Sequence, residues 1–166
     1  MIRKLAAIAL AAAIAGPAAA QDDDPMVAFE VLEPELALAL AEAARDACRE
    51  EGFQVAVAVV DRFGIPQAIL RDRFAGPHTV DTSTRKAWTA VSFRTGTQEL
   101  DERISAGELT ASLRDVPGAL MLGGGVPVMA AGSLAGGIGV SGAPSPQADE
   151  TCAEAGIEAI SGQLPF

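Results

Sequence analysis

Hydrophobic and polar residues follow different periods along the chain, and each period predicts an element. Between Pro34 and Gly52, apolar residues recur every three or four positions, which is the spacing of a helix with one buried face. Pro34 suits a first helical turn and Gly52 suits a helix end, so a helix is predicted between them. The period changes to two in FQVAVAVVD, residues 53–61, which predicts a strand. IPQAILR, residues 65–71, is predicted to return as its hairpin partner.

The second half of the chain repeats this order. Helical spacing resumes after a loop, in residues 80–95, with Thr79 or Asp81 as the expected N-cap. Residues 97–118 are polar and predict a short helix followed by irregular structure. Glycine-rich apolar sequence at 119–143 predicts two strands joined at AAG, and SPQADETCAEAGIEAI predicts a C-terminal helix. Hairpin-length connections favour an α+β fold, with an antiparallel sheet flanked by helices.

The N-terminal residues have the pattern of a secretory signal peptide. Arg3 and Lys4 precede an apolar run that ends in small residues at Ala20. We therefore expect a signal peptide at residues 1–20, cleavage near Ala20, and a periplasmic or secreted protein. Residues 21–32 are expected to form a loosely packed arm, and residues 33–166 a single domain. No later segment has the roughly 20 apolar residues of a membrane span, so no membrane insertion is expected.

The net charge of the chain limits the classes of partner that it is expected to bind. The formal net charge is −10, and loss of Arg3 and Lys4 with the signal would make it −12. Nucleic acids and anionic lipid surfaces are bound by clustered Lys and Arg, so an acidic chain argues against both. Cys48 and Cys152 would enter an oxidising compartment on export. From the residues alone they are either a disulfide or two buried free thiols.

Three sequence patterns of known nucleotide-binding and catalytic sites are incomplete or absent in this chain. GIGVSG, residues 137–142, has the spacing of a dinucleotide-binding turn, but prolines interrupt its way into the following helix. LGGGVP, residues 122–127, lacks the Lys and Ser or Thr of a P-loop, and no G-x-S-x-G nucleophile turn occurs. Close backbone approach explains these glycines better. Asp61 is interpreted as a turn residue that accepts backbone N–H groups.

His78 is the only histidine, and it precedes the second predicted helix. The positive end of the helix dipole favours the neutral imidazole, which can ligate iron. Arg71, Arg73, Arg85 and Lys86 make the densest basic patch of the chain and would suit the carboxylates of an anionic ligand. The alternative is a surface-loop histidine beside cations that pair with nearby acids.

Four blocks of the chain resemble the GlcG/HbpS-like haem-binding family, formerly a domain of unknown function. These blocks are VAVVDRFGIPQAILR, TSTRKAWTAVSF, GGGVPV and GGIGVSGAPSPQADETCAEAGIEAI, and the resemblance covers about residues 33 to 161. It implies a profilin-like fold in which the first and last helices pack as neighbours. That packing would let Cys48 and Cys152 meet and form a disulfide. It also implies homo-oligomers and, in some members, binding of haem or related tetrapyrroles.

The resemblance makes exported haem binding our main hypothesis, with a role in haem storage or redox sensing. His78 is then the candidate axial iron ligand, the cations pair with the propionates, and aromatic residues wall the site. The candidate haem-binding residues are His78, Arg71, Arg73, Lys86, Trp88 and Phe93, with Phe74 as a further wall.

Two other classes of function stay open, and no catalytic residue is assigned. The first is a protein or enzyme of a catabolic pathway that binds an organic acid or reactive metabolite, with Lys86 or Asp61 handling protons. The second is a structural or signalling module that acts through its oligomer surfaces.

Overall fold

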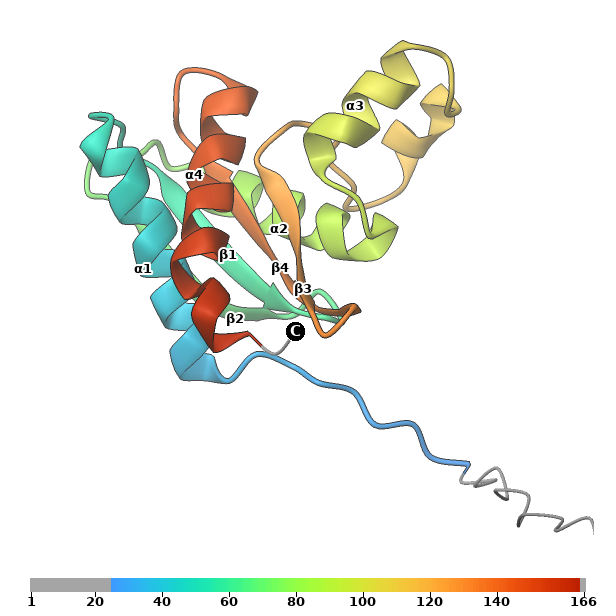
Figure 1. Ribbon diagram of the computed structural model, residues 1–166. Coiled ribbons are helices and arrows are strands. Elements are labelled where there is room, and N and C mark those ends of the chain that lie inside the picture. Colours follow the sequence, from blue (N-terminus) through green and yellow to red (C-terminus); the bar gives the residue numbers. More distant parts are fainter. Residues whose placement is uncertain (1–24, 165–166) are drawn as a thin grey trace, which may run out of the picture.

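A four-stranded antiparallel sheet forms the centre of the computed structural model, which describes residues 25–164 (Figure 1). The strands are β1 (Ala56–Asp61), β2 (Pro66–Arg71), β3 (Gly125–Ala130) and β4 (Ser133–Ser141), in the order β2-β1-β4-β3. Each predicted hairpin is present, and β1 pairs with β4 to join the two hairpins into one sheet. This confirms the predicted α+β class.

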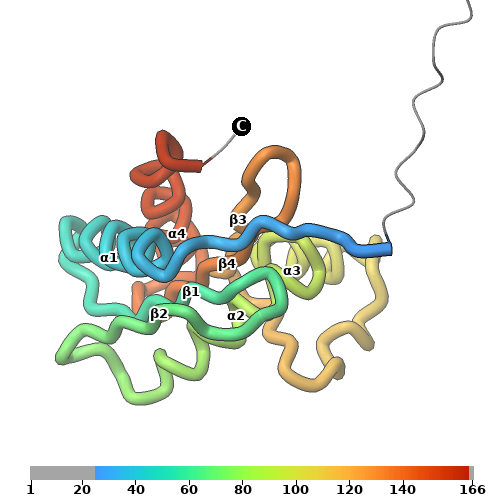
Figure 2. The backbone as a smooth tube through the Cα atoms, turned by 90° about the horizontal axis from the view of Figure 1, so that it is seen from below, coloured from blue at the N-terminus to red at the C-terminus, as the bar shows by residue number. Residues whose placement is uncertain are grey.

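Helices cover both faces of the sheet. The first and last helices, α1 (Pro34–Glu50) and α4 (Pro146–Ile160), pack side by side on one face, as the resemblance implied, and α2 (Thr79–Phe93) lies on the other (Figures 1 and 2). Two short 3₁₀ segments, Ala111–Asp115 and Ser161–Gln163, follow α3 (Thr97–Ser105) and α4 respectively.

Strand β1 is buried on both of its faces, whereas the alternating pattern predicted one core face. Val55, Val57 and Val59 point to the core under α1 and α4. The opposite face carries Ala56 and Ala58, which are also fully buried because α2 packs over them. Small alanines leave room for that helix, so the sequence shows a weak alternation although neither face meets water.

Glycines bring α2 very close to β4. A Cβ atom built on Gly139 would lie 2.0 Å from the carbonyl oxygen of Ser83, and one on Gly137 would lie 2.7 Å from a methyl carbon of Val91. Both distances are too short for real side chains, so the GIGVSG motif serves close helix–sheet packing. The crowded strand predicted for this motif is confirmed.

A disulfide joins the two helices on the opposite face. Cys48 of α1 and Cys152 of α4 are bonded, with their Cα atoms 5.4 Å apart. The helices approach closely beside it, because a Cβ on Gly156 would lie 2.7 Å from the Cβ of Ala44. The disulfide that the resemblance implied is therefore present.

Helices α2 and α4 begin differently. Ser145 caps α4 by accepting a hydrogen bond from the Ala148 amide. Helix α2 begins one residue earlier than expected, with His78 at the N-cap position and no side-chain cap. Thr79 is already inside the first turn, and its hydroxyl donates to the Gly76 carbonyl, so the prediction of Thr79 or Asp81 as the N-cap was wrong.

The N-terminal segment lies across the end of the sheet that carries both hairpin turns (Figures 1 and 2). Residues 25–31 are exposed and contain no helix or strand, and the Arg62 guanidinium stacks 3.8 Å above the Phe29 ring. The predicted signal peptide, residues 1–20, lies outside the described residues. Within residues 25–164, no helix combines the length and the hydropathy that a membrane crossing requires.

Candidate functional site

A cavity of about 750 Å³ opens where β4 ends and both α2 and α4 begin. We call it the His78 cavity. Its lining comes from four parts of the chain that are distant in sequence. The lining residues are Gly52, Phe53, Gln54, Phe74, Gly76, His78, Thr79, Thr82, Lys86, Leu122, Ser141, Gly142, Ala143, Pro144, Ser145, Pro146 and Asp149. Its volume lies within the usual range for small-molecule and cofactor sites, roughly 300–1,000 Å³.

A buried ion pair lies at this cavity. The Nζ atom of Lys86 is 2.7 Å from Oδ2 of Asp149, and it also donates to the Val140 carbonyl at 3.0 Å. The other carboxylate oxygen of Asp149 accepts the Ala143 amide at 2.9 Å. Lys86 is only 1% exposed. The pair thus ties α2, the end of β4 and the first turn of α4 together.

Burial shifts the titration of both partners. It is the largest cause of the lowered pKa of the Lys86 ammonium and of the raised pKa of the Asp149 carboxyl, and the attraction between the two opposes each shift. Each charge therefore depends on the other, because a buried charge without a partner is costly.

The loop that carries His78 is anchored at Asp72, which is 2% exposed. One carboxylate oxygen of Asp72 accepts two hydrogen bonds from the Arg49 guanidinium, and the other accepts the Val55 amide at 3.2 Å. The Ala75 amide donates to the Asp72 carbonyl. Arg49 stands at the end of α1, so that helix holds one end of the loop in place.

The His78 imidazole lies on the exposed rim of the cavity, against the backbone of Gly76. A Cβ on Gly76 would lie 2.6 Å from the imidazole Cε1, so a side chain at this position would displace the ring from the place it occupies. Within residues 25–164, neither ring nitrogen has a hydrogen-bond partner, and the His78 carbonyl accepts from Thr82. The ring is therefore available to a ligand.

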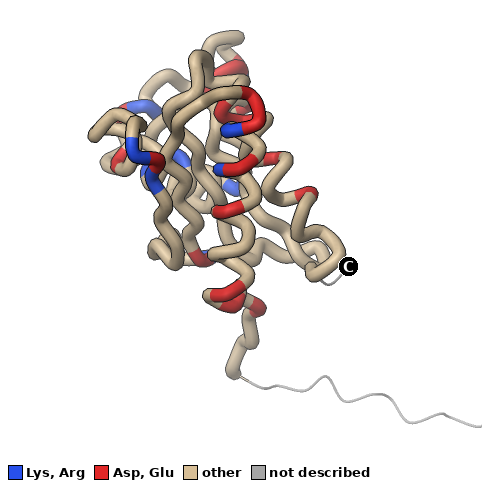
Figure 3. The backbone as a smooth tube through the Cα atoms, turned by 90° about the vertical axis from the view of Figure 1, so that its left-hand side faces the viewer, with Lys and Arg blue, Asp and Glu red and all other residues tan. Residues whose placement is uncertain are grey.

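Neither of the two arginines of the predicted site lines the cavity, and both contact the loop between β2 and α2. Arg71 ends β2, and its guanidinium donates to the Ala75 carbonyl of the loop. Arg73 is exposed, with its guanidinium 6.0 Å from the centre of the Phe74 ring. Arg85, the third arginine of the basic patch, instead donates to the carbonyls of Gly118 and Ala119. Because Lys86 is buried and Arg85 turns away, the predicted basic patch is dispersed. Acidic positions occur from the N-terminal segment to the opposite end of the molecule (Figure 3).

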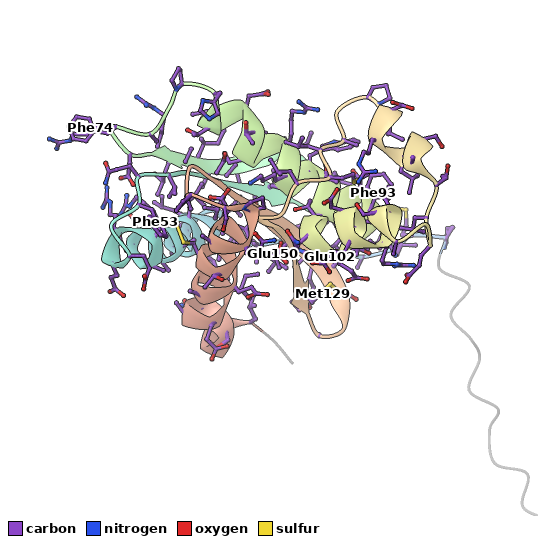
Figure 4. All side chains as sticks on the ribbon, turned by 90° about the horizontal axis from the view of Figure 1, so that it is seen from above. Phe53, Phe74, Phe93, Glu102, Met129 and Glu150 are labelled. Atoms are coloured by element: carbon purple, nitrogen blue, oxygen red, sulfur yellow. A yellow bond between two sulfur atoms is a disulfide. The ribbon has the colours of Figure 1, made fainter. Side chains whose placement is uncertain are left out.

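Trp88 and Phe93 do not reach the His78 cavity. They pack against a separate apolar cluster under α3, formed by Leu100, Ile104, Ala119 and Met121. A helix rises about 1.5 Å per residue, so Phe93 lies about 22 Å along α2 from His78. Figure 4 shows Phe53 and Phe74 at one end of the molecule and Phe93 at the other. The structure therefore separates these two aromatic residues from the other predicted site residues. The aromatic residues that line the cavity are Phe74, which was predicted, and Phe53, which was not.

Sequence reasoning missed Asp149, Ser141 and Asp72. Asp149 was interpreted only as part of the predicted C-terminal helix. A usable signal existed in α2, because Ser83, Lys86 and Ala90 fall on one helical stripe that is wholly buried. A lysine on such a stripe needs a buried acidic partner.

The other motifs behave as interpreted from the sequence. Oδ1 of Asp61 accepts the amides of Phe63 and Ile65, as expected for a turn residue. Gly124 has a φ of +113°, and a Cβ on Gly125 would lie 2.4 Å from the Lys86 carbonyl oxygen. The glycine turn is thus the tight backbone approach that was predicted. Within the described residues, no group of three or more His, Cys, Asp or Glu side chains is arranged to hold a metal ion.

Several known proteins are similar to this chain in sequence, and those with solved structures are similar in fold as well. A double-mutant form of HbpS from Streptomyces reticuli is 42% identical, with a TM-score of 0.77 over 88% of this chain and 97% of that chain. The structure described as a PduOC:heme complex is 30% identical, with a TM-score of 0.73 over 78% of this chain and 95% of that chain. An uncharacterized 15.0 kDa protein in the dhaT-dhaS intergenic region of Citrobacter freundii is 32% identical over 128 residues, which is 74% of this chain and 87% of that protein.

The sequence pattern of the family described as "Haem degrading protein HbpS-like" matches residues 32–158. The match spans both hairpins, α1, α2 and most of α4, including His78, Lys86 and Asp149. The predicted resemblance is confirmed, and the chain belongs to the HbpS-like family.

Proposed function

We propose that this protein binds haem or a related tetrapyrrole in the His78 cavity. The observation that carries the proposal is the position of the only histidine of the chain, unpartnered within the described residues, on the rim of a cofactor-sized cavity. The haem complex of a relative that is 30% identical supports the same ligand class.

The residues around His78 fit such a ligand. Phe53, Phe74 and Leu122 provide apolar surface, and Phe74 is 78% exposed beside the imidazole loop. Arg71 and Arg73 flank that loop and can pair with carboxylates at the rim. Bound haem would supply an iron centre, and His78 would hold it through an imidazole nitrogen.

We further propose that the protein is exported to the periplasm and works there as a homo-oligomer in haem storage or redox sensing. A signal-like segment at residues 1–20 supports export, and the Cys48–Cys152 disulfide suits an oxidising compartment. Fractionation of cells that produce the full chain, followed by N-terminal sequencing and light scattering of the mature protein, tests export, cleavage near Ala20 and assembly.

Haemin titration tests the binding proposal. Wild-type protein is expected to give a saturable Soret shift, and His78→Ala is expected to weaken binding about tenfold or more, because an iron ligand is lost. Added imidazole should restore the wild-type spectrum of the variant by filling the vacated iron position. Arg94→Ala, an exposed change at the far end of α2, serves as control. Wild-type protein that gives no saturable shift would contradict the proposal.

A second candidate function is the binding of an organic acid. The observation in its favour is the Lys86–Asp149 pair at the His78 cavity, since a buried lysine beside a carboxylate can bind or exchange protons with a small acid. The test is a thermal melt with a panel of small organic acids. A raised melting temperature with one of them, in protein that does not bind haemin, would favour organic-acid binding over haem binding.

A further inference from the structure

The His78 cavity is lined by a hydroxyl group without a partner among the described residues. Ser141 is 5% exposed as a residue, lines the cavity, and makes no side-chain hydrogen bond within residues 25–164. It follows Gly137 and Gly139 on the face of β4 that α2 covers. Its hydroxyl is open to the cavity and is not sealed in the core. The group is therefore free to bond to a polar atom of a ligand.

The beginning of α2 lies at the same cavity, which His78, Thr79 and Thr82 line. This 15-residue helix has no side-chain cap, and the amides of Val80 and Asp81 have no acceptor among the described residues. Helix α4 starts at the same cavity, but Ser145 caps it. Unsatisfied amides at a helix start favour a negatively charged group.

Lys86 adds a positive charge beside Ser141. Its ammonium group has three protons, and Asp149 and the Val140 carbonyl accept two of them. Asp149 is the acid of this region, and it is already engaged by Lys86 and by the Ala143 amide. One ammonium proton is therefore left for a ligand at the cavity that Lys86 lines.

The exposed rim of the cavity is apolar by contrast. Phe74 is 78% exposed, and Leu122 is 38% exposed. The buried part, with Ser141, Thr79 and Lys86, is polar. An amphipathic ligand gains most when its charged end lies inside and its apolar body lies against the rim.

We propose that the ligand enters the His78 cavity carboxylate first. One carboxylate accepts a hydrogen bond from the Ser141 hydroxyl, beside Lys86 and near the positive end of α2. This inference rests on the proposed function, under which the carboxylate is a haem propionate. It differs from an outward arrangement in which Arg71 and Arg73 bind both propionates at the rim.

Titrations with haemin and with haemin dimethyl ester, in one detergent-containing buffer, test the orientation. Esterification removes the charge and is expected to weaken wild-type binding about tenfold or more, since hydrogen bonds to charged groups are the strong ones. Ser141→Ala should weaken haemin binding by a similar factor and leave binding of the ester unchanged. Ser133→Ala, the same change at the exposed opposite end of β4, should bind like wild type. Arg71→Ala with Arg73→Ala should have little effect.

Other results would overturn the orientation. Haemin binding that is insensitive to Ser141→Ala, but lost with Arg71→Ala and Arg73→Ala, would reject it and leave haem binding intact. Absence of wild-type haemin binding would reject the proposed function and this inference together. Because Ser141→Ala removes an unpartnered hydroxyl, the unliganded variant is expected to unfold at the same urea concentration as wild type or higher. If it fails to fold, the Arg71→Ala, Arg73→Ala variant decides alone, because the outward arrangement requires those two arginines.

Discussion

Lys86 of α2 and Asp149 of α4 form a buried ion pair, with Nζ and Oδ2 2.7 Å apart, at the wall of the His78 cavity. The helices lie on opposite faces of the sheet, so the pair connects the two layers at the end of β4. The same contact therefore contributes to the fold and to the candidate site.

Removing one partner of this pair should be strongly destabilising. Lys86→Met leaves the Asp149 carboxylate buried without its counter-ion, and we expect the free energy of unfolding to fall by about 3–5 kcal/mol. Urea unfolding followed by circular dichroism measures the change. The double variant Lys86→Met, Asp149→Asn should recover part of the loss, because Asn still accepts the Ala143 amide and carries no charge. A single variant within 1 kcal/mol of wild type would show that the pair contributes little.

The disulfide should add several kcal/mol to the stability of the oxidised protein. Cys48 and Cys152 are separated by 104 residues, and a loop of that length is expected to contribute about 4–5 kcal/mol through the entropy of the unfolded chain. Urea unfolding with and without dithiothreitol gives the difference. Cys48→Ala with Cys152→Ala should match the reduced protein and should not respond to the reductant. An equal midpoint for oxidised and reduced wild type would contradict this expectation.

Gly139→Ala should disrupt the contact between α2 and β4. Its Cβ would lie 2.0 Å from the Ser83 carbonyl oxygen, so the helix must move away from the sheet. We expect the free energy of unfolding to fall by about 1–3 kcal/mol. The matched control is Gly162→Ala, where no atom lies within 4 Å of the added carbon, and its effect should stay within about 0.5 kcal/mol. Thermal melts of both variants provide the test, and equal melting temperatures would refute close packing at Gly139.

Glu150→Gln should stabilise the protein at neutral pH and have no effect in acid. Burial is the largest cause of the raised pKa of Glu150, and repulsion from Glu154 and Glu102 adds to it, whereas the Gly124 amide opposes it. Figure 4 shows Glu150 and Glu102 near each other. Because the pKa in the folded protein exceeds the ordinary value of 4.5, ionisation favours the unfolded chain as the pH rises through that window. The charge is therefore unfavourable at pH 7 and absent at low pH.

Urea titrations from about pH 4 to pH 7 measure this difference between Glu150→Gln and wild type. The curves should coincide at low pH and separate as the pH rises. Glu158→Gln removes an exposed acid from the same helix and should show no comparable separation. A Glu150→Gln variant that is less stable than wild type at pH 7 would mean that the Gly124 hydrogen bond outweighs burial.

Local patterns were sufficient to predict the elements. The period-two run through Val55, Val57 and Val59 predicted β1, and the proline and glycine at the two ends of α1 predicted its extent, because these signals act within one element. Helix α2 was also predicted, but its first residue was not, since Thr79 bonds back to Gly76 instead of capping. Loop geometry of this kind depends on the packing of Asp72 against Arg49, which no local pattern reports.

The candidate site was predicted only in part for the same reason. His78 and Lys86 were identified because a lone histidine and a basic patch stand out in an acidic chain. Trp88 and Phe93 were assigned to the site because they are near in sequence, but helix α2 carries them away from it. Ser141 lies 63 residues beyond His78 in the chain and joins the cavity only through the sheet.

The sequence by itself determined the order of helices and strands, the buried faces of most of them, and the resemblance to the HbpS-like family. Periodicity and turn residues report these features because they depend on neighbours three or four positions away. The tertiary structure decided which charges are paired, which hydroxyl lacks a partner and which aromatic residues face the cavity. Those relationships join residues on different elements, so only the packing of α2 and α4 against the end of β4 creates them.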